Sequence, residues 1–517
     1  MLLTWLILCL EAWLKLDVGE PIVRSLGSSR GPLWDLREGF YIKGFSRSEE
    51  HFADTIQFIP LDADTPDPPP IEFDFGFREF TADPGQGLIA LISNGPEKLV
   101  CFIRLSDPTN DRSSACYIHL CSSITGLAHP LAEQPRLTTE FTIITPSFFS
   151  FSIEIMKHML LAKLSDLGSK TYEVLIWDWK TGTLLHRIYS QEGMCDFTFL
   201  DERHLALLTC DCHSTQDDLA LLIYDISNGS PTHVAPPNDQ SQPNNALTTQ
   251  PILRLELPRL QESSRISETG FLLRSGPTPG RMIHTKSAAF SYSHATTLNM
   301  TFGFRPWGPP ISYRVFIDGR SLLNHLNIAS RNGAKVLPWA TWGPNATRWF
   351  TVQRESGRLL YWPYCMAGSK YTPQLSHLRY CCIFDFSSLT ISRSIQLAKL
   401  HPNAFLVDDD PVSASGRFAN LNFSDGYLTD FISELPPRSE LYAVVVGSEN
   451  ASIIEAGSSP ESGFSNSFTS RLPFRFVCRE TSLSHKGWQI LEDCIVGVGS
   501  EMAQTSSRSI TIYKLNQ

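Results

Sequence analysis

Short runs of apolar residues alternate with polar turns along most of this chain of 517 residues. Typical apolar runs are His158–Ser165, His204–Cys210 and Leu219–Ile226, and clusters of Gly, Pro, Asp, Asn and Ser separate them. Runs of strand length that are bounded by turn residues are typical of β-strands rather than of long amphipathic helices. The pattern therefore predicts an all-β fold.

One strand–turn–strand pattern occurs several times along the chain. It is clearest in "EVLIWDWKTGTLLHRI", Glu173–Ile188, where an apolar strand ends in an aspartate, a Lys-Thr-Gly turn follows and a second strand returns. Degraded copies begin at Cys116, Leu221 and Cys381. A repeat of roughly fifty residues with four strands per unit is typical of a β-propeller. The sequence thus predicts about seven four-stranded blades, with trial starts near residues 20, 76, 140, 195, 265, 340 and 400.

The clearest copy of this hairpin carries further structural expectations. Gly182 can supply the positive φ that a tight hairpin turn needs. The carboxylate of Asp178 can accept hydrogen bonds from backbone N–H groups in the turn. Trp177 and Trp179 are expected to pack between blades rather than to form a binding platform.

The sequence predicts one domain after a short N-terminal helix. Residues 1–18 form the helix, because the apolar run Leu2–Leu10 is too short to span a membrane; a signal peptide is the alternative. Residues 19–517 form a single β-propeller-like domain. Its ring is expected to close by pairing Pro21–Ser25 with Ile510–Leu515, which protects the strand edges. Three polar or Pro-rich stretches are expected to be disordered insertions near 62–74, 235–251 and 447–467.

Composition narrows the classes of partner. The formal net charge is −10 and no basic stripe stands out, so we expect neither a nucleic acid nor a membrane as partner. Twelve cysteines without a small-domain disulfide framework favour a reducing compartment. Five Asn-x-Ser/Thr tripeptides favour secretion instead; they begin at Asn228, Asn299, Asn345, Asn422 and Asn450.

The common catalytic motifs are absent from the sequence: it has no phosphate-binding loop, no His-Glu-x-x-His and no Gly-x-Ser-x-Gly. The best metal candidate is "CDCH", Cys210–His213, but it lacks a second ligand cluster at matching spacing. Three aspartates in Val407–Pro411 are more typical of a solvated loop than of an acid–base pair. We therefore predict a protein that is not an enzyme, with no catalytic residue, metal or cofactor.

Two aromatic stretches with arginines nearby are candidates for a binding surface. They are "FRPWGPPISY", Phe304–Tyr313, and "PWATWGPNATRWF", Pro338–Phe350, and their Pro and Gly content predicts loops. Tryptophan and arginine dominate many protein-binding surfaces. The predicted binding residues are Trp307, Trp339, Trp342 and Arg348, and blade-core packing is the alternative.

The chain resembles a family of F-box-containing proteins abundant in mushroom-forming fungi. The resemblance covers nearly all of the chain through short stretches: "EAWLKLDV" (Glu11–Val18), "PLWDLREGFYIKG" (Pro32–Gly44), "FREFTADPGQGLIALI" (Phe77–Ile92), "YIHLCSSITGLAHPLA" (Tyr117–Ala132), "LIWDWKTGTLL" (Leu175–Leu185), "FTFLDERHLALL" (Phe197–Leu208), "TWGPNATRWF" (Thr341–Phe350) and "SRLPFRFV" (Ser470–Val477). The resemblance implies the substrate-binding region of a ubiquitin-ligase receptor.

The F-box itself has no match here, because the chain begins with what resembles only the tail of the helical lead-in. No adaptor contact can therefore be carried over to this sequence. The expected function is a non-catalytic protein-interaction module in the cytoplasm or nucleus, coupled to ubiquitylation if the full gene product holds an F-box. The alternative is a secreted or lumenal β-propeller that binds or hydrolyses glycans.

Overall fold

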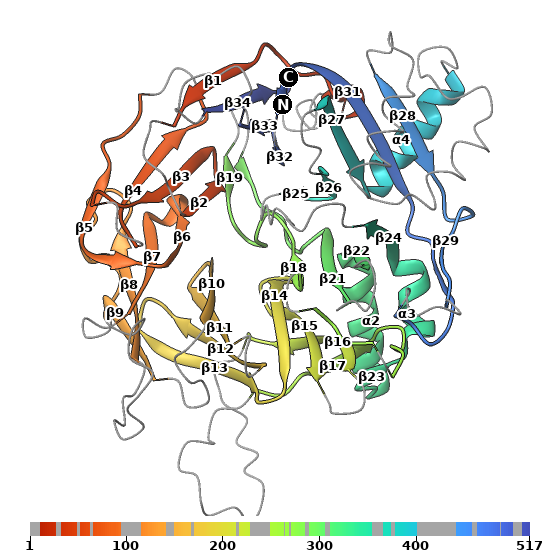
Figure 1. Cartoon of the computed structure of the whole chain (residues 1–517), viewed down its shortest axis with the longest axis horizontal. Coiled ribbons are helices and arrows are strands. Elements are labelled where there is room, and N and C mark those ends of the chain that lie inside the picture. The colour runs from red at the N-terminus through yellow and green to blue at the C-terminus, as the bar shows by residue number, and fades with distance from the viewer. Residues whose placement is uncertain are drawn as a thin grey trace, which may run out of the picture.

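The computed structural model forms a closed ring of seven antiparallel sheets around a central axis (Figure 1), which confirms the all-β, seven-bladed propeller. The structure describes residues 11–26, 33–48, 52–62, 66–94, 115–140, 149–166, 170–212, 217–227, 249–262, 264–267, 270–284, 289–304, 311–353, 365–373, 378–400, 441–456, 463–485, 487–499 and 509–516.

The first four blades follow one another in chain order, each with four strands and its first strand nearest the axis. Blade 1 holds β2 (Leu33–Arg37), β3 (Phe40–Phe45), β4 (Ala53–Pro60) and β5 (Ile71–Phe77). Blade 2 holds β6 (Glu79–Asp83), β7 (Leu88–Asn94), β8 (Ala115–Ser122) and β9 (Arg136–Glu140), with a 3-10 turn at Pro84–Gln86. Blade 3 holds β10 (Phe149–Met156), β11 (Met159–Asp166), β12 (Thr171–Asp178) and β13 (Thr183–Ser190). Blade 4 holds β14 (Gly193–Phe199), β15 (His204–Cys212), β16 (Asp217–Asp225) and β17 (Leu253–Glu256).

The remaining blades carry insertions or borrowed strands. Blade 5 holds β18 (Leu272–Arg274), β21 (Thr297–Gly303), β22 (Ile311–Asp318) and β24 (Thr347–Gln353). Blade 6 holds β25 (Met366–Ala367), β26 (Lys370–Tyr371), β27 (Leu378–Asp385) and β31 (Phe474–His485), with β28 (Tyr442–Val446) on its outer edge. Blade 7 holds β32 (Gly487–Ile490), β33 (Cys494–Val498), β34 (Ser509–Lys514) and β1 (Ile22–Ser25).

The ring closes as the sequence predicts. Strand β1 pairs antiparallel with β34, with Ile22 opposite Ile512 and Ser25 opposite Ser509. The first described strand, β1, is therefore the outer strand of the last blade, beside the last strand of the chain, β34 (Figure 1). Seven hydrophobic clusters fill the spaces between successive blades, one at each sheet-to-sheet contact. The core is thus a ring of seven interfaces.

The hairpin of Glu173–Ile188 joins β12 to β13 and has the predicted turn chemistry. The Asp178 carboxylate accepts a hydrogen bond from the Lys180 N–H at 2.9 Å, and Gly182 has φ +74°. Trp177 and Trp179 are buried in the cluster between blades 2 and 3, and the Trp179 indole donates to the backbone carbonyl of Lys157 at 2.8 Å. The expected packing between blades is confirmed.

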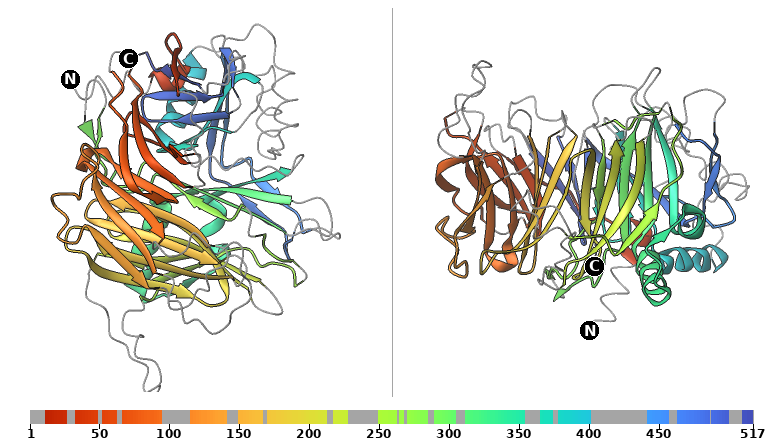
Figure 2. Two further views of the ribbon diagram at one scale, coloured as in Figure 1. Left: turned by 60° about the vertical axis from the view of Figure 1, so that its left-hand side comes forward. Right: turned by 90° about the horizontal axis from the view of Figure 1, so that it is seen from below.

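Several segments that the sequence pattern assigns to loops or blade starts have regular structure of another kind. Between β22 and β24 of blade 5 the chain forms α2 (Gly319–Asn332), β23 (Val336–Leu337) and α3 (Trp339–Ala346), so a blade start near residue 340 is wrong. Strand β23 pairs parallel with β17 at the edge of blade 4. In blade 6, α4 (Ser388–Leu400) follows β27, so a start near residue 400 is wrong. These helices lie at one rim of the ring (Figure 2, right).

The predicted disordered insertions are partly ordered. The stretch 62–74 ends inside β5, which pairs with β4. The stretch 447–467 contains β29 (Ser452–Ile454), which pairs with β30 (Phe468–Ser470), and the fully buried Phe464. Both segments are mostly polar, but the few apolar residues they contain pack on blades 1 and 5 and hold them in place. Most of 235–251 lies outside the described residues.

The N-terminal segment packs on blades 6 and 7. Residues 11–15 are helical, and the Trp13 indole is buried and donates to the backbone carbonyl of Glu492 at 3.1 Å. Arg479 donates to the carbonyl of Leu16 at 2.8 Å. Among the described helices none is long and apolar enough to cross a membrane.

Candidate functional site

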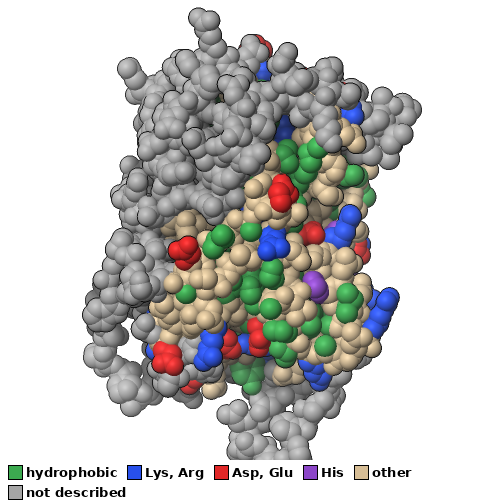
Figure 3. Space-filling model, turned by 90° about the vertical axis from the view of Figure 1, so that its right-hand side faces the viewer, with side chains coloured by type: hydrophobic (Ala, Val, Ile, Leu, Met, Phe, Trp, Pro, Cys, Tyr) green, Lys and Arg blue, Asp and Glu red, His purple; other side chains and the backbone are tan. Residues whose placement is uncertain are grey.

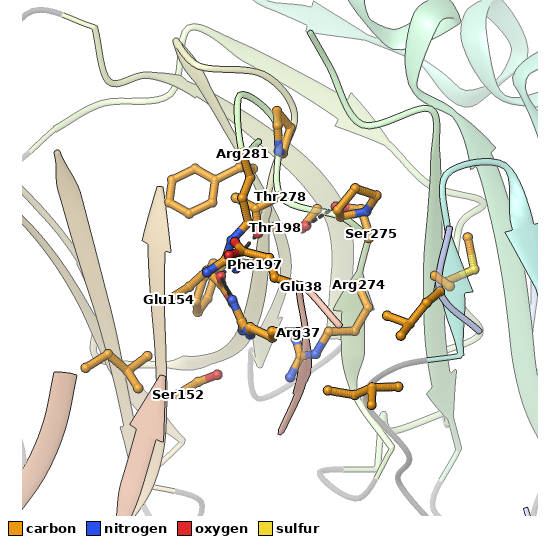
Figure 4. A pocket seen from close by; sticks show the side chains of 18 of the residues that line it. Arg37, Glu38, Ser152, Glu154, Phe197, Thr198, Arg274, Ser275, Thr278 and Arg281 are labelled. Atoms are coloured by element: carbon orange, nitrogen blue, oxygen red, sulfur yellow. Dashed lines mark hydrogen bonds and ion pairs between the residues drawn. The ribbon is translucent and has the colours of Figure 1, made fainter. Parts of the chain in front are cut away.

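A cavity of about 440 Å³ lies on the propeller axis, which we call the channel pocket (Figure 4). Its lining comes from the innermost strands and following turns of the seven blades. The charged residues of the lining are Arg37, Glu38, Glu79, Glu154, Arg274, Arg281 and Glu492.

Arg37 joins blades 1 and 3 across the pocket. Its guanidinium binds both carboxylate oxygens of Glu154, at 2.6 and 2.7 Å, and its Nε contacts Asp35. The Thr278 hydroxyl donates to the same Glu154 carboxylate at 3.1 Å. Although burial alone would raise it, the pKa of Glu154 lies below its ordinary value because Arg37, Arg281 and Thr278 favour the charged form. This ion pair is bidentate, the stronger geometry for arginine and carboxylate.

A long connection of blade 5, residues 275–296 between β18 and β21, reaches across the channel to other blades. It contains the short hairpin β19 (Ile283–His284) and β20 (Ala289–Phe290), drawn in green inside the ring in Figure 1. The backbone carbonyl of Gly276 accepts from the Gly368 N–H of blade 6 at 2.6 Å. We call residues 275–284 the crossing segment.

Arg281 fixes the crossing segment to blades 1 and 2. It forms an ion pair with Glu38, donates to the carbonyl of Ala82 at 2.6 Å and lies 3.7 Å from the Asp83 carboxylate. Glu38 occupies the left-handed region, with φ +48°, in the tight turn between β2 and β3. A non-glycine residue in this region is strained and is retained where its surroundings hold it. Here Arg281 and the Gly85 N–H, at 2.8 Å, hold the Glu38 carboxylate.

Two lining carboxyl groups have raised pKa values. Burial raises the pKa of Glu79 to about 7; nearby Asp35 adds to this, while Arg274 and Arg37 oppose it. Burial likewise raises the pKa of Glu492 to about 7, with Asp493 adding to the effect. Each lining arginine, in contrast, is already bonded to a carboxylate. The arginines are therefore internally compensated, and Glu79 and Glu492 hold protons near neutral pH.

A second cavity of about 280 Å³ adjoins the channel pocket between blades 3, 4 and 5. Asp196 is fully buried behind it, between Lys163 at 2.8 Å and Arg274. Burial opposes the charged form, but Arg274, Lys163 and the backbone N–H of Leu273 keep the pKa of Asp196 below its ordinary value. This triad links three neighbouring blades by buried charge.

The described residues lining the channel pocket include neither histidine nor cysteine, so its chemistry is that of carboxyl, guanidinium and hydroxyl groups.

Of the four residues predicted to bind a partner, the three that the structure describes do not form a common exposed surface. Trp339 and Trp342 lie in α3 and Arg348 in β24, so the prediction that Pro338–Phe350 forms a loop is wrong. The Trp342 indole is buried and donates to the carbonyl of Glu256 at 2.9 Å. The buried Arg348 guanidinium donates to the carbonyls of Leu472 and Asn450, both at 2.7 Å. Trp307 lies outside the described residues.

The physical reason is that Pro338 and Gly343 serve a helix here rather than a turn. Pro338 occupies the N-cap position of α3, and the bare backbone of Gly343 lets the Trp339 ring lie against it. Trp339 packs edge-on against Trp342 and Trp349. Figure 3 views this side of the molecule and shows hydrophobic and charged side chains intermingled over it.

An ordered loop of blade 2 carries three exposed large apolar side chains, including the most exposed one among the described residues. It connects β8 to β9 and presents Ile124, Leu127 and Leu131, which are 83%, 71% and 58% exposed to solvent. We call residues 122–135 the apolar loop. Its own backbone hydrogen bonds fix its shape: the Gly126 N–H donates to the Ser122 carbonyl and the Ser122 N–H to the Leu127 carbonyl, at 2.9 and 2.8 Å.

The buried side chain of His129 attaches the apolar loop to blades 2 and 3. Its buried ring accepts from the Leu131 N–H at 3.2 Å through Nδ1, so Nε2 carries the proton and donates to the Gln86 carbonyl at 3.2 Å. The ring also lies edge-on to Trp179 of blade 3, with centroids 4.9 Å apart. The loop is therefore rigid although its apolar side chains are exposed.

Comparisons with known proteins give fold-level similarity only. No protein-family model and no curated protein matches the chain. Among solved structures, the chain is similar to Drosophila Semaphorin 1b, extracellular domains 1–2, with 10% identity, a TM-score of 0.37, and coverage of 96% of this chain and 86% of that one. It is also similar to Kuenenia stuttgartiensis hydrazine synthase (11% identity, TM-score 0.30, coverage 57% and 67%) and to oligopeptidase B from Leishmania major (10%, 0.25, 73% and 56%).

Sequence reasoning missed both the channel residues and the apolar loop. The channel residues are separated along the chain, because each blade supplies one innermost strand, so no local motif joins them. A charged residue within the first strand of several blades was the available pattern. The apolar loop lies within the hairpin copy that begins at Cys116, and that pattern does not predict exposed apolar side chains. The apolar residues Ile124 and Leu127, which stand on either side of a turn, were the available indication.

Proposed function

We propose that this chain is a non-catalytic protein-interaction module whose contact surface is the apolar loop. The observation that carries the proposal is the combination of exposure and rigidity in Ile124, Leu127 and Leu131. Exposed apolar side chains on a mobile loop lose conformational entropy when they bind, whereas a preorganised loop avoids much of that cost. Clustered exposed apolar groups commonly mark protein-binding sites.

The channel pocket fits a structural role better than a catalytic one. Its arginines are bonded to carboxylates of other blades, as in Arg37 with Glu154 and Arg281 with Glu38. An arginine that recognises a substrate must instead have donors left to offer. The crossing segment also occupies one end of the channel, which favours binding on the outside of the ring.

The partner that suits the apolar loop is a protein segment with apolar side chains of its own. The resemblance to fungal F-box proteins supports a more specific role, in which the bound protein is a ubiquitylation target and an F-box in the full gene product supplies the link to the ligase. That role places the protein in the cytoplasm or nucleus.

The test replaces the three apolar side chains together. The variant Ile124→Ser, Leu127→Ser, Leu131→Ser removes the surface without touching His129. A partner captured from the native cells is purified, and its affinity for both forms is measured directly. We expect at least about a ten-fold loss of affinity at an unchanged melting temperature. Leu389→Ser on α4, with 75% of that residue exposed, is the matched control and should bind normally. Equal binding by the triple variant would refute the proposed surface.

The alternative function, a secreted glycan-binding protein or hydrolase, is favoured by one observation. Asn345 of a glycosylation tripeptide is exposed on α3, whereas Asn299 lies within β21 with its side-chain oxygen buried. Treatment of the native protein with an endoglycosidase decides between the two. A mobility shift that Asn345→Gln abolishes supports secretion and contradicts the cytoplasmic or nuclear role; an unchanged mobility supports that role.

A further inference from the structure

Three potential metal ligands lie together on blade 4, away from the channel pocket. Cys210 and Cys212 are two residues apart on β15, so their side chains point to the same face of the sheet. Asp217 begins the neighbouring strand β16 and lies directly opposite Cys212 in the register. The "CDCH" motif lacks a second ligand group in the sequence alone, and the fold supplies one from the next strand.

The distances suit a tetrahedral metal ion. The two cysteine sulfurs are 3.9 Å apart. Two thiolates bound at the usual zinc–sulfur distance of about 2.3 Å in a tetrahedral site are about 3.8 Å apart. One carboxylate oxygen of Asp217 and the two sulfurs all lie within 4.8 Å of one another.

The hydrogen bonding of Asp217 points independently to a ligand. The side chain is fully buried, and its Oδ2 accepts from the Ile266 N–H at 2.8 Å. Its Oδ1 is buried without a hydrogen bond and has one long ion-pair contact, 3.9 Å from Nε of Arg265. A buried carboxylate oxygen without a hydrogen bond is costly and calls for an explanation. A cation between this oxygen and the sulfurs would supply the missing interaction.

We propose that Cys210, Cys212 and Asp217 bind one Zn²⁺ ion. Soft thiolates select zinc over calcium or magnesium, and a carboxylate is a regular zinc ligand. Cys212 is partly exposed, which gives the ion a path from solvent and leaves a fourth position for water.

The ion would stabilise the end of blade 4 at which β15 ends and β16 begins. Its ligands join β15 to β16, and through Ile266 the site extends to the segment that leads into blade 5. Binding releases the two thiol protons to solvent and involves no change of oxidation state. The role is structural, since a metal held by two thiolates of one strand and a carboxylate of the next contributes its binding free energy directly to folding stability.

The experiment uses the full chain, purified under reducing conditions and loaded with ZnCl₂. After gel filtration, metal content is measured by mass spectrometry and affinity by competition with a chromogenic chelator. We expect one equivalent of zinc in the wild type and at least about a ten-fold loss of affinity in Cys212→Ser and Asp217→Asn. The amide oxygen that Asp217→Asn introduces can still accept the Ile266 hydrogen bond, so this variant separates metal binding from folding. Substitution with Co²⁺ should give the visible absorption of a tetrahedral thiolate complex.

The matched control is Cys195→Ser on β14. Cys195 belongs to the same sheet but faces the cluster between blades 3 and 4, whereas Cys210 faces the cluster between blades 4 and 5. This control should retain full zinc affinity. The proposal is overturned if the wild type retains no zinc, or if Cys212→Ser and Asp217→Asn both retain it with wild-type affinity.

Discussion

At the scale of single residues, Glu79 shows how the channel sets protonation chiefly through burial. Its pKa is raised to about 7, from an ordinary value of 4.5. Between these two pH values the folded protein holds a proton that the unfolded chain releases. Stability should therefore fall as pH rises from about 4.5 to 7 and should then level off.

Replacing this carboxyl by a neutral amide tests the effect. In Glu79→Gln, the free energy of unfolding should lack this decline, so the variant gains stability relative to the wild type by on the order of 2–3 kcal/mol between pH 5 and pH 8. Urea unfolding of both proteins at the two pH values measures the gain. The exposed Glu133, replaced by Gln, is the control. An identical pH dependence in wild type and Glu79→Gln would contradict the raised pKa.

Single residues also mark the limit of sequence-based prediction. The roles of Asp178 and Gly182 follow from the chemistry of one turn, so they could be predicted and are confirmed. The roles of Arg37 and Glu154 could not, because the residues are 117 positions apart and meet only when blades 1 and 3 face each other across the axis. Asp217 is similar, since only strand register places it opposite Cys212.

At the scale of elements, hairpins were predictable and insertions were not. The β12–β13 hairpin contains all the information for its own formation, namely apolar strands and a glycine turn. Helix α3 does not, because its Pro and Gly residues are typical of loops and its amphipathic face forms only against blade 5. Trp342 and Trp349 bury their rings there, so tertiary packing decides the conformation of this stretch.

The crossing segment gives a prediction at the same scale. Arg281→Met keeps the apolar stem but leaves the buried carboxylates of Glu38 and Asp83 without their arginine. The loss of one partner of a buried ion pair costs about 3–5 kcal/mol. Urea unfolding should show this loss, and hydrogen exchange should show faster exchange in residues 275–284.

A second substitution separates ion pairing from packing. Adding Glu38→Gln to Arg281→Met removes one orphaned carboxylate, so the double variant should be more stable than the sum of the two single effects predicts. Strict additivity of the two effects would show that Arg281 stabilises the protein without energetic coupling to Glu38.

At the scale of the whole molecule, closure of the ring holds the two ends of the chain together. Strand β1 covers the edge of β34, and Leu26 and Ile22 pack in the cluster between blades 7 and 1. Burial of Leu26 alone contributes about 1.5–3 kcal/mol. An uncovered β34 would present a free strand edge, which favours association between molecules.

Removal of β1 should therefore both destabilise the propeller and promote its association. A chain that starts at residue 27 should melt at a lower temperature and elute partly as oligomers in size-exclusion chromatography. A synthetic peptide of residues 17–26 should restore the melting temperature and the monomer, because β1 joins the ring by backbone pairing and the side chains of Ile22 and Leu26. A peptide of the same composition in scrambled order should not. If the shortened chain melts like the full one and stays monomeric, the ring is held by the blade interfaces alone, and the pairing of β1 with β34 contributes little to stability.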